Sequence, residues 1–310
     1  MIESEQICEL INTSLANLRW KFSELEGKQE LAIDSYPSVY FSPTAKGTVA
    51  GGSAKWVRKK HNSGGIHEPG MIAIFDVLKK YVQHIETVLD IGSLYGYFSL
   101  LGAAVFTSAN IYSFEMNKYS YHALKENILI NTHLNIERVK LFNCAISSFS
   151  YANKRILFND FFMKEIEKVS VLERITSFFK KEALDENMID FITLDEFCSK
   201  YNIKPGLIKI DVEGYQSEII LGGIKTIKRF RPLILIEFDE ASSVNATGKT
   251  NKDVSKYLFD TDYKLIWGDH RAFDGKFQPL NIKCMNERHE CNSLAFFYPS
   301  EYFMNNEYKI

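Results

Sequence analysis

The sequence predicts an α/β fold with a doubly wound, mostly parallel sheet and helices on both of its faces. Strand-like and helix-like segments alternate from about residue 87 to residue 267, which is typical of parallel sheets with crossover helices. Runs such as "LILI", residues 233–236, are apolar at successive positions, as strands covered on both faces are. The chain has 310 residues, of which 45% are hydrophobic, so it can form one large domain or two small ones.

The N-terminal part of the chain lacks this alternation. Apolar residues from Ile7 to Leu25 recur at helical spacing and predict one amphipathic helix over residues 4–25. Residues 36–70 are rich in proline and glycine, and we expect them to be irregular. The predicted organisation is therefore an N-terminal extension, residues 1–66, followed by a main domain, residues 67–310.

The main domain is predicted as a series of strands joined mostly by helices. A helix over residues 71–84 leads into the first strand, and a helix near residues 250–259 precedes the last two strands. Strands are expected at 87–91, 110–115, 138–143, 206–211, 232–238, 263–267 and 292–298, with further helices at 97–107, 118–131, 193–201 and 214–229.

Composition argues against several classes of protein. Lys plus Arg number 37 and Asp plus Glu number 39, so the formal net charge of −2 does not favour nucleic acid as a partner. No apolar run approaches the ~18 residues that a membrane span requires. The N-terminus, "MIESEQICEL", lacks the basic start and apolar stretch of a signal peptide. Five scattered cysteines do not suggest a disulfide framework, and we expect a reduced, cytoplasmic protein.

The stretch "VLDIGSLYGYFSL", residues 88–100, predicts a ligand site. A buried strand runs into a turn with Gly92 and Gly96, and such turns lie at the edge of an open α/β sheet where ligands bind. A dinucleotide fingerprint would need a glycine where Leu94 stands, and Asp90 would be a poor neighbour for a diphosphate. S-adenosylmethionine fits better, because an acid can hold its ammonium group. The alternative is a turn that serves only the fold.

Two further strand ends support a nucleoside ligand. Glu115 closes the second strand, where an acid can accept both hydroxyls of an adenosine ribose, although a solvent-exposed Glu would look the same. This holds for NAD and for S-adenosylmethionine alike. At the tip of the third strand, Cys144 precedes Ala145, whose small side chain leaves room for an adenine ring.

The block "LIKIDVEGYQSEIILGGIKTIKRFRPLILIEF", residues 207–238, places two acids at the tips of neighbouring strands. Asp211 ends one buried strand and Glu237 ends the next. Carboxylates at this edge can bind Mg²⁺, bind substrate hydroxyls or act as a base. His67 and His270 could each serve as the base instead, and a structural role is the alternative for both.

These motifs together resemble the FkbM family of S-adenosylmethionine-dependent methyltransferases. The resemblance rests on "VLDIGSLYGYFSL", "IYSFEMN", "ITLDEF", the upstream "HEPG" and the long block at residues 207–238, called the D-V-E-G block below. It covers roughly residues 67–300. It implies a class I methyltransferase fold, Rossmann-like, with a seven-stranded sheet whose last strand is antiparallel. Residues 67–310 would be the methyltransferase domain. The insert at about 147–189 would be a lid, an acceptor-selecting element or a surface elaboration.

The resemblance also implies roles for individual residues. By the resemblance, nine residues are expected to bind the cofactor, S-adenosylmethionine: Glu68, Asp90, Gly92, Ser93, Gly96, Glu115, Met116, Cys144 and Ala145. Asp211, Glu237 and His67 are the candidates for catalysis. In the glycine turn Ser93 and Leu94 replace the Ala and Asn that the family usually has, which removes a polar contact near the methionine end of the cofactor.

The expected function is O-methylation of a small molecule, sugar or glycan precursor. The basic stretch "KWVRKKH", residues 55–61, is most simply interpreted as a solvated loop, and the functional alternative is an anion clamp for a phosphorylated or nucleotide-linked acceptor. Metal-free catalysis is favoured over Mg²⁺. Two other functions stay open: an NAD(P)-linked oxidoreductase, against which Leu94 counts, and a cofactor-binding subunit without catalysis.

Overall fold

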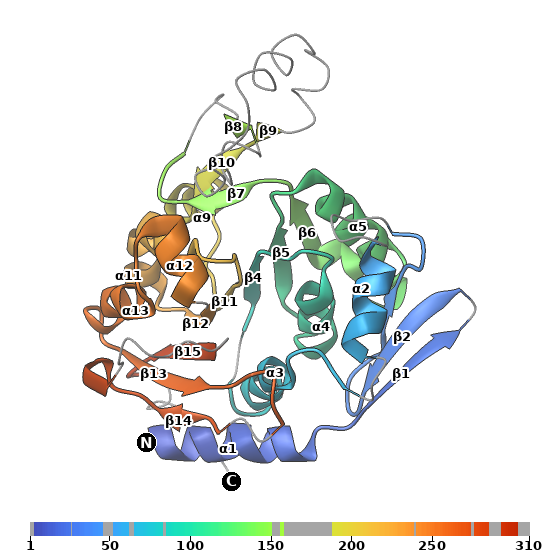
Figure 1. Ribbon diagram of the computed structural model, residues 1–310, viewed down its shortest axis with the longest axis horizontal. Coiled ribbons are helices and arrows are strands. Elements are labelled where there is room, and N and C mark those ends of the chain that lie inside the picture. Colours follow the sequence, from blue (N-terminus) through green and yellow to red (C-terminus); the bar gives the residue numbers. More distant parts are fainter. Residues whose placement is uncertain are drawn as a thin grey trace.

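The computed structural model describes residues 3–25, 27–45, 52–61, 65–82, 85–150, 156–157, 188–238, 240–273, 276–284 and 293–302. Its centre is a sheet with the strand order β14-β13-β15-β12-β11-β4-β5-β6 (Figure 1). In that order the strands are Gln278–Pro279, Tyr263–Gly268, Ser293–Pro299, Leu233–Phe238, Leu207–Ile210, Thr87–Ile91, Asn110–Phe114 and Val139–Phe142.

The sheet confirms the predicted fold class. Strands β6, β5, β4, β11 and β12 are parallel, and the last strand, β15, lies antiparallel between β12 and β13. The seven expected strands are all present, and the two-residue strand β14 extends the sheet beside β13. The carboxyl ends of β4, β5, β11 and β12 therefore share one edge, which is where a doubly wound sheet binds ligands.

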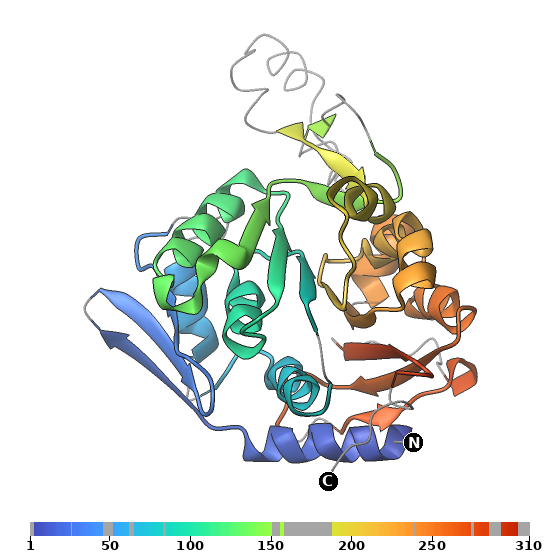
Figure 2. The ribbon, with the colours of Figure 1, turned by 180° about the vertical axis from the view of Figure 1, so that it is seen from behind.

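Helices cover both faces because successive strand residues point to opposite sides. Val88, Leu207 and Leu233 belong to one apolar cluster with residues of α1, α3, α4 and α5. Their neighbours in sequence, such as Leu89 and Ile208, belong to a second cluster with residues of α9, α10, α11 and α13. The two views in Figures 1 and 2 show these groups of helices on opposite sides of the sheet. The helices are α1 Ser4–Asn17, α3 Pro69–Tyr81, α4 Tyr97–Val105, α5 Lys118–Leu129, α9 Leu194–Tyr201, α10 Gln216–Gly222, α11 Ile224–Phe230 and α13 Asn251–Phe259.

The single helix expected over residues 4–25 is wrong in its second half. Helix α1 ends at Asn17, and residues Trp20–Leu25 form β1, which pairs antiparallel with β2, Lys28–Ile33. Gly27, with φ +76°, makes the turn between them. Alternate residues of β2 are buried, a two-residue period that favours a hairpin over helical continuation. Strand β3, Val39–Phe41, completes this small sheet.

Residues 36–70 are also more regular than expected. Helix α2, Gly52–His61, contains the basic stretch that was interpreted as a solvated loop, and Ala54, Val57 and His61 of this helix are buried. Helix α3 begins at Pro69, which suits a first helical position because proline has no N–H to satisfy. The boundary at residues 66/67 stays a prediction, although Ile7, Ile11 and Leu15 of α1 pack in one cluster with α3.

Two smaller differences concern the region around the predicted insert and the D-V-E-G block. The helix expected at 214–229 is divided into α10 and α11 at Gly223. A helix that was not predicted, α12, Glu240–Thr247, follows β12.

Short strands flank the predicted insert. Strand β7, Ala145–Ser147, pairs with β10, Phe191–Thr193, and β8, Ile156–Leu157, pairs with β9, Met188–Ile189. Most of the predicted insert, residues 151–155 and 158–187, lies outside the described residues. None of the helices in the described part of the chain is long and apolar enough to cross a membrane.

Candidate active site

The glycines of the β4–α4 turn are required by the protein's own packing. Gly92 has φ +83°, and a Cβ placed there would lie 1.8 Å from the carbonyl oxygen of Asp211 at the tip of β11. Gly96, also at φ +83°, caps α4, and its Cβ would lie 2.5 Å from Leu124 Cδ1 on α5. The close neighbours that exclude side chains from this turn are therefore the tip of β11 and helix α5.

Gly92→Ala should destabilise the protein because the new methyl group collides with backbone that cannot rotate away. Gly248→Ala is a matched control, since Gly248 has φ +69° and open space where its Cβ would lie. Both variants pay the cost of a left-handed alanine, but only Gly92→Ala adds overpacking, which typically costs about 1–3 kcal/mol. Urea unfolding of the two variants measures the difference, and equal losses would contradict this account of Gly92.

A cavity of about 420 Å³ lies at the shared edge of β4, β5 and β11. Six residues of the predicted site line it: Gly92, Glu115, Met116, Cys144, Ala145 and Asp211. Sequence reasoning did not assign a site role to the other lining residues, which include Leu94, Phe114, Asn117, Ile146, Val212, Glu213 and Tyr215. Most of these adjoin a predicted residue in the chain, and this adjacency was the signal that could have found them.

Glu115 lies in this cavity with its carboxylate held from both sides. Its Oε2 accepts a hydrogen bond from the Leu94 backbone N–H at 2.9 Å, and its Oε1 accepts one from the Asn117 N–H at 2.7 Å. Burial raises the pKa of Glu115 to about 7, while these two N–H groups act in the opposite direction. Each oxygen keeps a further lone pair, so the fixed carboxylate can still accept hydroxyl groups of a ligand.

Beneath the turn lies a buried lysine that the sequence analysis did not assign to the site. Strand register sets Lys209 of β11 beside Asp90 of β4, and Lys209 Nζ lies 3.3 Å from Asp90 Oδ1 and 3.1 Å from Asp211 Oδ2. Burial alone would lower the pKa of the Lys209 ammonium, but Asp211, Asp90 and Glu68 raise it above its ordinary value. A lysine inside the apolar strand "LIKI" was the sequence signal for this network.

Asp90 faces this lysine and not the cavity. Its Oδ2 accepts a 2.5 Å hydrogen bond from Ser99 Oγ, which in turn accepts one from Ser113 Oγ. Ser93 and Gly96 are likewise absent from the residues that line the cavity among those the structure describes. Ser93 Oγ donates to the Asp90 carbonyl, so these predicted cofactor residues support the turn from below. Direct contact of Asp90, Ser93 or Gly96 with a cofactor stays a prediction.

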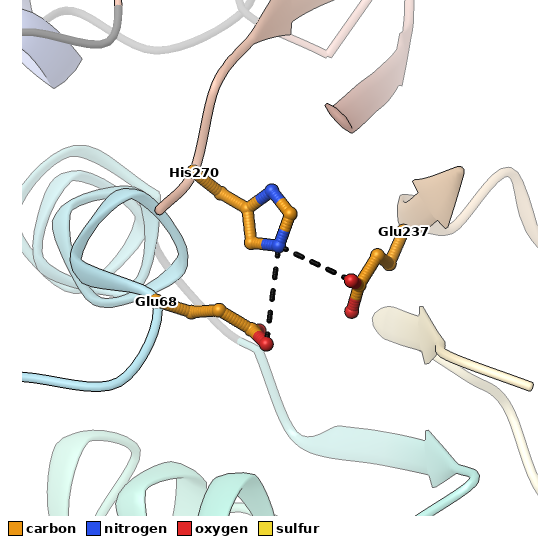
Figure 3. A group of neighbouring side chains, drawn as sticks. All are labelled: Glu68, Glu237 and His270. Carbon is orange, nitrogen blue, oxygen red and sulfur yellow. Dashed lines mark ion pairs between the residues drawn. The ribbon is translucent and has the colours of Figure 1, made fainter. Parts of the chain in front are cut away.

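A second group of buried polar side chains lies outside the set that lines the cavity (Figure 3). It joins two predicted residues, Glu68 at the start of α3 and Glu237 in β12, to His270, which follows β13. His270 Nε2 lies 3.4 Å from Glu237 Oε1 and 3.8 Å from Glu68 Oε1. His67 Nε2 lies 3.1 Å from Glu68 Oε1, and Arg271 Nη2 lies 2.5 Å from Glu237 Oε1.

The two carboxylates of this group have opposite pKa shifts. Burial, together with the charges of Glu237 and Asp211, raises the pKa of Glu68 well above its ordinary value. Burial would also raise the pKa of Glu237, but His270 and Arg271 lower it to about 2. His67 is deeply buried, and burial lowers the pKa of its imidazole well below the usual range. A neutral His67 can accept a proton only at a large energetic cost, which makes it a poor base.

Asp211 connects the cavity with this buried group. Residues Ile210 and Ile236 are paired in parallel register, so the following residues, Asp211 and Glu237, lie at neighbouring strand tips, as the sequence predicted. The Asp211 side chain is 26% exposed, into the cavity. Burial raises the pKa of Asp211 to about 7 against the attraction of Lys209, and Glu237 adds to the rise. This value suits an acid that gains or loses a proton near neutral pH.

Some basic side chains of helix α2 interact with other residues of the protein. Arg58 donates two hydrogen bonds to the carboxylate of Glu24, and Lys60 lies over the ring of Trp56. Trp56 in turn makes edge contacts with His67 and Tyr97. The stretch 55–61 therefore joins the β1–β2 hairpin to the surroundings of the buried group, and its role as an anion clamp stays a prediction.

Comparisons with known proteins give one family match and several similar solved structures. A family model described as "Methyltransferase FkbM domain" matches residues 90–265. No curated protein matches the sequence significantly. Similar solved structures include a methyltransferase FkbM from Methylobacillus flagellatus, at 15% identity and a TM-score of 0.45, covering 69% of this chain and 43% of that chain. They also include an S-adenosylmethionine-dependent O-methyltransferase from Thermotoga maritima, at 12% identity and a TM-score of 0.36, covering 73% of this chain and 63% of that chain.

This chain thus spans less than half the length of the Methylobacillus protein. The family model, in contrast, spans more than half of the 310 residues and includes the glycine turn, Glu115 and the D-V-E-G block. On the strength of that match, the chain belongs to the FkbM methyltransferase family.

Proposed function

We propose that the protein is an S-adenosylmethionine-dependent O-methyltransferase. The observation that carries the proposal is the cavity at the edge of the sheet, which has the fixed carboxylate of Glu115 on one wall and Asp211 on another. Its volume of about 420 Å³ lies in the range of small-molecule sites. The family match supports the same reading.

The proposed cofactor site uses the β4 and β5 side of the cavity. Glu115 would accept the two ribose hydroxyls, since both of its oxygens are oriented by backbone N–H groups. Ala145 and Ile146 would flank the adenine, with Met116 and Phe114 nearby. The turn from Gly92 to Leu94 would face the methionine end. When bound, S-adenosylmethionine supplies a methyl group on a positively charged sulfur.

Asp211 is the proposed acid–base group on the acceptor side. The acceptor oxygen forms a bond to the methyl carbon while the carbon–sulfur bond breaks and its electron pair stays on sulfur. Asp211 would accept the proton that the hydroxyl loses. Lys209 positions this carboxylate by binding Oδ2, and the rest of the catalytic effect would come from holding the two reactants in line. The acceptor would be a hydroxyl of a small molecule or sugar.

Two experiments test the proposed function as a whole. Titration calorimetry with S-adenosylhomocysteine and, separately, with NADH distinguishes a methyltransferase from an NAD(P)-linked oxidoreductase. We expect binding of S-adenosylhomocysteine alone. A panel of hydroxylated acceptors, with release of S-adenosylhomocysteine as the readout, then tests for turnover, and binding of NADH in its place would contradict the proposal.

Glu115→Gln should weaken binding of S-adenosylhomocysteine by about 1.5–3 kcal/mol, because the ribose loses a charged acceptor. The variant keeps one oxygen for the backbone N–H of Leu94 or Asn117, so the fold should survive. Calorimetry measures the affinity. Glu126→Gln, on the exposed side of α5, is the control and should bind as the original protein does. Equal affinity in both variants would remove Glu115 from the cofactor site.

The pH dependence of binding gives an independent check on Glu115. Because its pKa is raised to about 7, the carboxyl is increasingly protonated as the pH falls below that value. The ionised form is the better acceptor for two hydroxyls, so affinity should fall with decreasing pH, by up to about 1.4 kcal/mol per unit. Glu115→Gln has no proton to gain at this position, so its affinity should change less between pH 6 and pH 7 than that of the original protein, with Asp211 as the remaining carboxyl of the cavity that titrates there. A flat profile in the original protein would contradict the assignment.

A further inference from the structure

The group formed by Glu68, Glu237 and His270 contains polar atoms whose hydrogen-bonding needs are unmet. In the part of the chain that the structure describes, neither ring nitrogen of His270 has a hydrogen-bond partner, and neither does Glu68 Oε2. The His270 side chain is 0% exposed, so water does not reach it from the surface. Buried polar atoms are normally paired, and such an exception requires an explanation.

We propose that these three side chains form a binding site for one divalent transition-metal ion. Each offers a ligand atom, and the three atoms lie within 4.8 Å of one another. The distances of 3.4 Å and 3.8 Å from His270 Nε2 to the two carboxylate oxygens are too long for good hydrogen bonds. They are close to the separation of about 3.0–3.5 Å that two ligands at about 2.1 Å from the same ion adopt.

The protein supplies these ligands from well-fixed positions. Glu68 precedes α3 in a left-handed conformation, φ 47°, an arrangement that costs energy, and its side chain is buried. Glu237 lies in the central strand β12, and its main-chain carbonyl accepts a hydrogen bond from Gln216. The His270 carbonyl accepts a hydrogen bond from the Gly70 N–H, and this bond ties His270 to the start of α3. Figure 3 shows the three side chains converging from these elements.

The donor set indicates which ions would bind. One imidazole with two carboxylates suits Mn²⁺, Fe²⁺, Co²⁺ or Zn²⁺, whereas Mg²⁺ prefers oxygen ligands and keeps several waters. This set differs from the oxygen-only arrangement around Asp211 and Glu237 that the sequence suggested for Mg²⁺. Its nitrogen ligand comes from a segment about 30 residues beyond the D-V-E-G block.

One neighbouring cation competes with a metal at this site. Arg271 Nη2 lies 2.5 Å from Glu237 Oε1, the oxygen that also faces His270. The Arg271 side chain is 44% exposed, so it can move into solvent when an ion takes its place. If no ion binds, Arg271 is the permanent charge partner of Glu237, and the group is an internal ion-pair network. The experiment below separates these two cases.

A metal here would lie next to Asp211, at the tip of the neighbouring strand. If the proposed function is correct, the ion would therefore be on the acceptor side and could orient the acceptor oxygen. The binding site itself does not depend on that function, because its ligands are all protein side chains.

The test is a titration of the chelator-stripped, full-length protein with Co²⁺ in the absence of cofactor and acceptor. Visible absorption reports the ligand field, and calorimetry reports the stoichiometry. We expect one Co²⁺ per chain. His270→Gln and Glu237→Gln should each lower the affinity by more than about 100-fold, beyond the effect of losing an outer partner. His61→Gln is the matched control, since His61 is also buried but stacks on Phe22 and Tyr97, and it should bind Co²⁺ normally.

Arg271→Ala provides a second arm that leaves all three ligands intact. Removal of the competing cation should tighten Co²⁺ binding, by about tenfold if Arg271 opposes the ion by ~1.4 kcal/mol. The proposal is overturned if the original protein takes up no Co²⁺ or if folded His270→Gln and Glu237→Gln bind it as the original does. Weaker binding by Arg271→Ala would overturn it as well. Failure of methyl transfer would leave these outcomes unaffected, because no step of the titration uses cofactor or acceptor.

Discussion

Lys209→Met is expected to lower the free energy of unfolding by about 3–5 kcal/mol, the cost of removing one partner from a buried ion pair. Lys209 and Asp90 are each only 2% exposed. Without the ammonium, Asp90 keeps its hydrogen bond from Ser99 but loses its 3.3 Å ion pair, and Asp211 loses its 3.1 Å contact. The methionine fills most of the lysine's volume, so the loss reports charge and not a cavity.

The effect should extend to the cofactor site. Lys209 Nζ also lies 3.4 Å from the Gly92 carbonyl, and it therefore joins the β4 turn to the tip of β11. We expect Lys209→Met to lose binding of S-adenosylhomocysteine even where it remains folded. Urea unfolding measures the stability and calorimetry the binding.

Two further variants separate charge from general disruption. Lys204→Met removes an exposed lysine from the segment just before β11 and should change stability by less than about 0.5 kcal/mol. Adding Asp90→Asn to Lys209→Met removes the uncompensated charge and should recover part of the loss, as a double-mutant cycle would show. A loss below about 1 kcal/mol for Lys209→Met alone would mean that water or another group compensates Asp90.

The sheet could be predicted from the sequence because the motifs that indicate its strands and turns are local. The strand "TVLDI" and the turn at Gly92 lie within a few residues of each other, and the D-V-E-G block sets Asp211 and Glu237 at the ends of strands that could only be neighbours. Strand ends also explain why two of the predicted residues, Glu115 and Ala145, line the cavity. Each of these inferences needs only the order of strands in a doubly wound sheet.

Interactions between distant segments could not be predicted in this way. His270 lies about 200 residues from Glu68, and nothing near it in the chain indicates that β13 returns its following loop to the start of α3. The hairpin of β1 and β2 was missed because Leu18, Phe22 and Leu25 fit helical spacing. There the pairing partner in β2 decided the structure, and a partner is not visible in the periodicity of one segment.

The glycine turn shows how a sequence signal can have more than one physical cause. Gly92 and Gly96 were interpreted as the mark of a ligand site at the edge of the sheet. The nearest atoms to their missing Cβ positions are Asp211 O and Leu124 Cδ1, which belong to the protein. The turn is tight because the tip of β11 and α5 lie against it.

Asp211→Asn is expected to lower kcat by about 100-fold or more, the scale of a lost general base, while the affinity for S-adenosylhomocysteine changes little. The side chain keeps its shape and its oxygen can still face Lys209, but an amide cannot take a proton from the acceptor. Rates with an acceptor found in the panel, together with calorimetry, measure the two quantities. Thermal unfolding of the variant controls for the weakened contact with Lys209.

Glu218→Gln is the matched control for this loss. Glu218 lies on α10, seven residues after Asp211, and its carboxylate accepts a hydrogen bond from Ser148 outside the cavity-lining set. The same loss of one negative charge there should leave kcat within about twofold. A rate for Asp211→Asn that matches this control would remove Asp211 from catalysis and leave orientation of the reactants as the main effect of the site.

The rate after chelation decides whether Asp211 acts alone. If the ion proposed at Glu68, Glu237 and His270 activates the acceptor, EDTA treatment should lower kcat and added Mn²⁺ or Zn²⁺ should restore it, since the acceptor hydroxyl then loses its proton more easily. If Asp211 is sufficient, the chelated protein keeps its full rate while Asp211→Asn does not. Methyl transfer from a sulfonium needs little help at the hydroxyl, so we expect the second result. A metal at Glu68, Glu237 and His270 would then not contribute to methyl transfer, in which the proton goes to Asp211.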